Sequence, residues 1–85
     1  MTKSDIIVSL QKFIIETFLF GQDKGLKPEE SLLKKGIIDS TGVIELIDFI
    51  ESAFHIIVDD EEIVPDNLDS IDRAAAFVLR KRADL

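Results

Sequence analysis

Ser40 is the side chain of this sequence that is best placed for covalent chemistry. It follows a loop-like stretch that contains Gly36 and precedes apolar residues at helical spacing, so its hydroxyl is expected at the start of a helix. The N-terminus of a helix carries a partial positive charge and favours an attached anion. A phosphate ester on Ser40 would benefit from that position. The preceding Asp39 could orient a metal ion or an attacking hydroxyl in a partner enzyme. Ser40 is therefore a candidate for modification, one of two interpretations of this position.

Serine is also one of the commonest residues to cap a helix, so Ser40 could simply begin this one. A capping box is absent, because Val43 stands where Glu or Gln would be needed. Gly42 in the first turn weakens a helix by about 1 kcal/mol relative to alanine. Helix stability alone therefore does not explain these residue types. Ile44 shares a helix face with Ser40, and we expect it to be exposed for contact with a partner or a cargo.

Other chemistry has little support. The chain has no cysteine, which excludes a thiol nucleophile and a cysteine-bound metal, and it has a single histidine, His55. We expect His55 to be a helix-end or partly buried residue without a direct functional role. The acidic residues 59–62 lack the alternating ligands and the glycine of a calcium-binding loop. Nothing in the sequence places Ser40, His55 and an acid together, so a catalytic triad and a hydrolase are not predicted.

The elements that must position Ser40 are helices. Residues 4–20, 40–54 and 70 onward have apolar residues every three or four positions, as amphipathic helices do. We predict Ser4 and Ser70 as caps, Gly21 as the end of the first helix and Leu79 on the apolar face of the last. A short helix is expected at 65–69, after a packed loop at 55–58. The fold class predicted is all-α: a four-helix bundle of three main helices and one short helix, in a single domain over residues 1–85. The long connection 21–39 should pack on the core, with a turn of helix near 29–34.

Charge is distributed unevenly along the chain. The net charge is −7, yet the 37 residues 36–72 hold eleven acids and no lysine or arginine. This stretch includes most of the helix that begins at Ser40. An acidic face can keep a small domain soluble, and it can also steer basic partners toward the protein. We favour a docking surface for basic partners.

The same composition argues against nucleic-acid binding, secretion and insertion into a membrane. Strong negative charge makes nucleic acid an improbable partner. We find no signal-peptide pattern, and no apolar segment reaches the roughly 20 residues of a membrane span. We expect a soluble, cytoplasmic monomer.

The segment Asp39-Ser40-Thr41-Gly42-Val43-Ile44-Glu45-Leu46 resembles the phosphopantetheine attachment motif of acyl carrier proteins and related carrier domains. That motif is Asp-Ser-Leu followed, at the same spacing, by a Glu-Leu pair. The resemblance extends over nearly the whole chain: the first helix, the long loop, the acidic helix, the apolar run 56–58 and the alanine-rich last helix. The chain therefore resembles a free-standing, specialised member of this family.

The resemblance implies a function. Ser40 would be esterified by 4′-phosphopantetheine, donated from coenzyme A by a phosphopantetheinyl transferase. The terminal thiol of the arm would hold a cargo as a thioester for fatty acid or secondary metabolite biosynthesis. The protein would not be an enzyme but a partner of an acyl- or aminoacyl-activating ligase and of downstream acyl-transfer enzymes. The residues implied in partner binding are Thr41, Ile44, Glu45, Asp48 and Glu51.

Three positions depart from the family pattern. Thr41 replaces the usual leucine, Gly42 replaces a common acidic residue, and His55 stands where glycine or aspartate is frequent. The Asp-Ser-Thr-Gly form of the motif resembles that of carriers dedicated to specialised pathways. Two alternatives remain open: an aminoacyl or peptidyl carrier of the same fold, and an acidic helical interaction module that is never modified.

Overall fold

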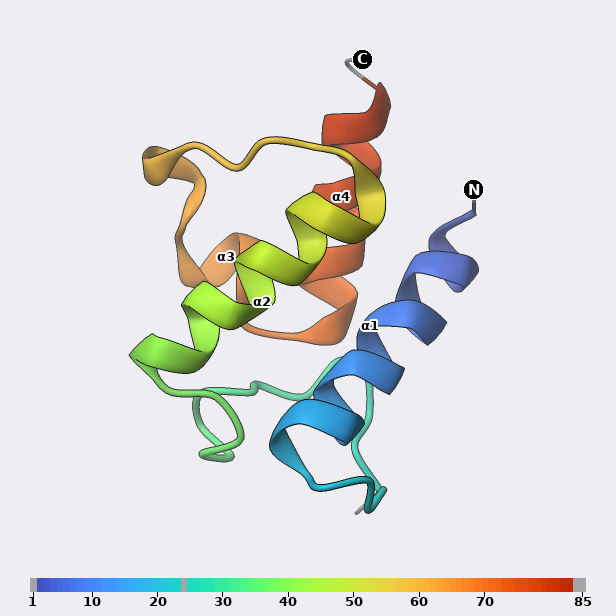
Figure 1. Ribbon diagram of the computed structural model, residues 1–85, viewed down its shortest axis with the longest axis vertical. Helices are drawn as coiled ribbons and strands as arrows, with labels where there is room; N and C mark the ends of the chain where they lie inside the picture. Colours follow the sequence, from blue (N-terminus) through green and yellow to red (C-terminus); the bar gives the residue numbers. More distant parts are fainter. Residues whose placement is uncertain (1, 24, 84–85) are drawn as a thin grey trace.

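The computed structural model describes residues 2–23 and 25–83, and these residues form helices joined by loops, without a strand. The order is α1 (Lys3–Phe18), α2 (Ser40–Phe54), a 3₁₀ turn η1 (Asp60–Glu62), α3 (Pro65–Leu68) and α4 (Ile71–Ala83) (Figure 1). This confirms the all-α prediction of three main helices and one short helix. No helix in the described part of the chain is both long and apolar enough to cross a membrane.

The first helix begins and ends differently from the prediction. Thr2, not Ser4, is the cap: its hydroxyl accepts a hydrogen bond from the Asp5 N–H, and the Asp5 carboxylate accepts one from the Thr2 N–H. The helix ends at Phe18, and Phe20 takes the left-handed conformation with φ 54°. The Gly21 N–H donates to the carbonyl of Ile15 at 2.9 Å, which closes the last turn.

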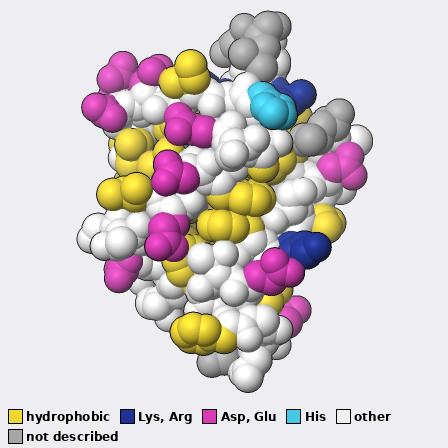
Figure 2. Space-filling view, viewed as in Figure 1, with side chains coloured by type: hydrophobic (Ala, Val, Ile, Leu, Met, Phe, Trp, Pro, Cys, Tyr) yellow, Lys and Arg dark blue, Asp and Glu magenta, His cyan; other side chains and the backbone are white. Residues whose placement is uncertain are grey.

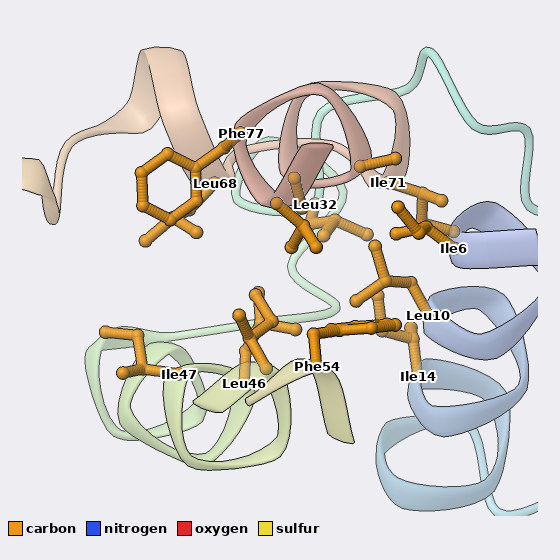
Figure 3. Close-up of a cluster of buried hydrophobic side chains, with 14 of the residues drawn as sticks. Ile6, Leu10, Ile14, Leu32, Leu46, Ile47, Phe54, Leu68, Ile71 and Phe77 are labelled. Carbon is orange, nitrogen blue, oxygen red and sulfur yellow. The ribbon is translucent and has the colours of Figure 1, made fainter. Parts of the chain in front are cut away.

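The core forms where the apolar faces of α1, α2 and α4 meet, and Figure 3 shows these side chains pointing toward one another. Phe13 of α1 stacks on Phe49 of α2 with ring centroids 4.2 Å apart, which adds an aromatic contact at the edge of the core. The predicted apolar face of α4 is wrong at one position. Leu79 is 38% exposed, whereas Phe77 is fully buried.

The connection between α1 and α2 packs on the core. The turn of helix predicted near 29–34 forms as one uncontinued turn at 31–35, where the Lys35 N–H donates to the Ser31 carbonyl at 3.2 Å, and another turn lies at 28–29. Asp69 holds the connection: its carboxylate accepts from the Ser31 hydroxyl at 2.7 Å and from the Leu33 N–H at 3.0 Å. The Asp69 carbonyl also accepts from the Leu32 N–H. These bonds satisfy backbone groups of the loop and fix it while Leu32 inserts into the core.

Gly42 lies where α2 passes closest to the end of α1. A Cβ atom added there would be 3.0 Å from Cε1 of Phe18 and 3.2 Å from Cγ2 of Ile38. Ile38 is buried and Phe18 packs against the core, so neither can move freely. The glycine that looks like a weakness in the sequence is therefore required by packing.

We predict that Gly42→Ala will destabilise the protein, although alanine is the better helix former. Overpacking costs about 1–3 kcal/mol, which exceeds the gain of about 1 kcal/mol in helix propensity. The midpoint of thermal unfolding, followed by circular dichroism, should fall by several degrees. Thr41→Ala is the matched control, because Thr41 is exposed in the same turn and its replacement should leave the midpoint unchanged or higher. A higher midpoint for Gly42→Ala would contradict the packing argument.

Candidate attachment site at the start of α2

Asp39, not Ser40, caps α2. Asp39 has extended backbone angles, and its carboxylate accepts a hydrogen bond from the Gly42 N–H at 2.8 Å. Ser40 is the first residue inside the helix. The alternative interpretation of Ser40 as the helix cap is therefore wrong, because the residue before it performs that task.

The hydroxyl of Ser40 is consequently free for chemistry. The side chain is exposed, and it forms no hydrogen bond with any residue that the structure describes. It stands in the first turn of a 15-residue helix, where the partial positive charge of the helix dipole is concentrated. A hydroxyl in this position can accept a phosphoryl group without losing a structural bond.

An apolar pocket of about 430 Å³ opens beside Ser40. One side of the pocket is α2 itself. The other sides are the loop before α2 and the segment that leads into α3. Its lining residues are Leu32, Leu33, Ile38, Ser40, Val43, Ile44, Ile47, Ile63, Val64, Pro65, Leu68 and Asp69. A group attached to Ser40 therefore starts on the rim of a hydrophobic pocket of the size that small ligands occupy.

The sequence analysis missed most of this pocket. It singled out Ile44, which is 62% exposed as expected, but not the segment Ile63-Val64-Pro65. The available signal was an apolar triplet that follows four consecutive acids, and the loop after α2 brings that triplet to the pocket.

The predicted partner-binding acids do not all have the same surroundings. Thr41, Glu45 and Asp48 are exposed and spaced four and three residues apart, so they share one outer face of α2. Glu45 and Asp48 form no ion pair with a described residue. Glu51 is half-buried, and its carboxylate accepts from the Val58 N–H at 2.9 Å, so it also has a structural task. Figure 2 shows acidic side chains spread over the face that carries α2, with hydrophobic side chains exposed among them.

His55 lies at the opposite end of α2 from Ser40. It ends the helix in the left-handed conformation, with φ 57°, and is exposed. Fifteen residues of helix separate it from Ser40, roughly 22 Å at 1.5 Å per residue. The two side chains cannot share a proton, which excludes a Ser–His pair at this site.

The roles of the adjacent residues Asp39 and Ser40 can be separated by measuring the free energy of unfolding of their variants. We expect Asp39→Ala to lower the free energy of unfolding by about 1 kcal/mol, because the Gly42 N–H loses its acceptor. Asp39→Asn keeps an acceptor and should unfold close to the wild type. Ser40→Ala should stay within about 0.5 kcal/mol of the wild type. Urea unfolding of the three variants checks this, and a larger loss for Ser40→Ala than for Asp39→Ala would contradict the assignment of the cap.

The sequence was also compared with known proteins. No protein-family model matches the chain. A curated relative from Serratia sp. (strain ATCC 39006), named "Probable acyl carrier protein PigG", is 30% identical over 70 residues. The matched region covers 82% of this chain and 80% of the relative. This identity over most of both chains shows that the chain belongs to the acyl carrier protein family.

Proposed function

We propose that Ser40 carries 4′-phosphopantetheine and that the protein delivers an acyl group, held as a thioester on that arm, between biosynthetic enzymes. The observation that supports this most is the free, exposed hydroxyl of Ser40 on the rim of an apolar pocket, with the capping task taken by Asp39. The protein itself catalyses no step. A phosphopantetheinyl transferase, an activating ligase and downstream acyl-transfer enzymes act on it.

The attachment step requires only one atom of this chain to react. Oγ of Ser40 bonds to the phosphorus that bears the pantetheine, the pyrophosphate bond of coenzyme A breaks, and adenosine 3′,5′-bisphosphate leaves. The hydroxyl proton passes to a base of the transferase. The N-terminus of α2 then lies beside a phosphodiester anion, which its dipole favours.

The pocket supports an acyl cargo over an aminoacyl cargo. Its lining is almost wholly apolar. Asp69 is the ionisable residue among the lining residues, and both of its carboxylate oxygens already accept hydrogen bonds, from Ser31 and from Leu33. The ammonium group of an aminoacyl thioester would lose its water in this pocket with little compensation, whereas an alkyl chain would gain from burial.

The attachment is tested by intact mass after incubation with coenzyme A and a broad-specificity phosphopantetheinyl transferase. We expect the wild type to gain one phosphopantetheine and Ser40→Ala to gain none. Ser52→Ala is the control, since Ser52 is an exposed serine of the same helix and should be modified like the wild type. No mass gain with several transferases would support the interaction module that is never modified.

We further propose that the outer face of α2 meets basic surfaces of partner enzymes. Glu45 and Asp48 supply unpaired negative charge, Ile44 supplies an exposed apolar contact, and Thr41 lies beside them. Glu51 contributes charge from a position that its bond to Val58 already fixes. Charges at the rim of an interface act mainly on the rate of association.

Reversal of charge on this face should therefore slow binding to the transferase. We expect Glu45→Lys or Asp48→Lys to reduce the association rate about three- to tenfold at low salt, with the difference shrinking as salt screens the charges. Glu29→Lys makes the same charge change at an exposed site in the long loop and should have a smaller effect. Stopped-flow or biosensor measurements at two salt concentrations check this. Equal rates for all the variants would rule out the docking face.

A further inference from the structure

One wall of the Ser40 pocket contains no buried residue, whereas the other walls each contain at least one. We use the name wall segment for residues 59–64, which include η1 and supply Ile63 and Val64 to the pocket. These two side chains are 39% and 40% exposed, and η1 contains no buried residue. Burial in the core therefore does not fix the wall segment, as it does fix Leu46 and Ile47 of α2.

The wall segment also carries adverse charge. Asp59, Asp60, Glu61 and Glu62 are consecutive acids, and like charges at this spacing repel one another. The stretch 36–72 has no lysine or arginine of its own, so any cation that offsets this repulsion must come from elsewhere in the chain.

Lys81 of α4 is such a cation. Its Nζ lies 2.8 Å from Oε1 of Glu62 and 3.9 Å from Oδ2 of Asp59. The same Glu62 oxygen accepts from the Asp59 N–H at 2.9 Å, which closes the turn on itself. The hydrogen bond from Lys81, followed by that from Asp59, lowers the pKa of Glu62, so its carboxylate is ionised at neutral pH.

A second contact joins the same parts of the molecule. The Glu62 carbonyl accepts from Nδ2 of Asn67 in α3, and Oδ1 of Asn67 accepts from Arg80 of α4 at 3.0 Å. The Lys81 and Glu62 side chains are only 23% and 26% exposed. In the other ion pair between α4 and this part of the chain, the Arg73 and Asp66 side chains are 53% and 95% exposed. The Lys81–Glu62 pair is therefore the less screened by solvent.

We propose that the ion pair Lys81–Glu62 holds the wall segment against α4 and so controls the opening of the pocket beside Ser40. With the pair formed, Ile63 and Val64 complete the apolar lining. With the pair broken, repulsion among the four acids moves the wall segment away from α4, and the pocket opens to water. This proposal rests on the proposed function in one respect: the group shielded by the closed wall is the acyl chain on the Ser40 arm.

Amide hydrogen exchange on the unmodified protein tests the first part. The N–H groups of Glu62, Ile63 and Val64 donate to the carbonyls of Asp59, Asp60 and Glu62, so their exchange reports opening of the turn. We expect Lys81→Met to raise exchange at these three amides about three- to tenfold. Arg73→Met is the matched control, because it makes the same charge change on α4 and removes the more exposed pair; it should change exchange less than about twofold.

Equal exchange in the two variants, or no increase in Lys81→Met, would overturn the proposal. If Lys81→Met fails to fold, as judged by circular dichroism, Glu62→Gln replaces it. That variant removes the charge but keeps an oxygen to accept from the Asp59 N–H, and it must show an increase at the same amides.

The loaded protein tests the second part. Hydroxylamine takes the acyl group from an octanoyl thioester and releases the thiol, at a rate that depends on how well the chain is shielded. We expect this rate to rise about threefold or more in Lys81→Met, but not in Arg73→Met. If no phosphopantetheine attaches to Ser40, the proposed function fails while the exchange result still decides whether the pair holds the wall. Attachment with unchanged exchange and unchanged release would refute this inference alone.

Discussion

The arrangement of this protein depends on how it offsets a long stretch of negative charge. Residues 36–72 contain eleven acids and no base, so their countercharges must come from the two ends of the chain. The last helix supplies most of those in the structure: Arg73 pairs with Asp66, and Lys81 pairs with Asp59 and Glu62. These pairs join α4 to the wall segment and to α3, both of which line the pocket. Among the acids of this stretch that form no ion pair with a described residue, Glu45 and Asp48 lie on the outer face of α2, where a partner can supply the missing charge.

Neighbouring residues divide structural and chemical tasks at the start of α2. Asp39 binds the Gly42 N–H and stabilises the helix, which leaves Ser40 exposed and without a bond to give up. Gly42 lets the end of α1 approach, and Phe18 and Ile38 close the space around it. A serine that also capped the helix would have to give up or weaken that bond on modification. The observed division keeps the scaffold unchanged whether or not the hydroxyl is esterified.

The helices could be predicted because each must bury one face: Ile6, Leu10 and Ile14 repeat at helical spacing, and so do Leu46, Ile50 and Phe54. The residues that cap the helices were harder to predict. Adjacent Asp39 and Ser40 are both good capping residues, and only the backbone geometry shows which of them is the cap. The pocket could not be predicted, because Ile44 and Val64 line the same pocket only where the loop after α2 has brought the chain back. The hydrogen bond from the Val58 N–H to the Glu51 carboxylate could not be predicted either, because it depends on the path of the loop after His55.

Under the proposed function, the position of Ser40 on the rim has a consequence for how the protein would share its cargo. A group tethered there divides its time between the pocket and the solvent, and a partner enzyme can use only the fraction that extends outward. The apparent dissociation constant of such a partner rises by the inverse of that fraction. A chain that prefers the pocket about tenfold, or about 1.4 kcal/mol, would weaken partner binding about tenfold. Cargoes would thus be delivered in order of their affinity for the pocket, with the more hydrophobic ones released more slowly.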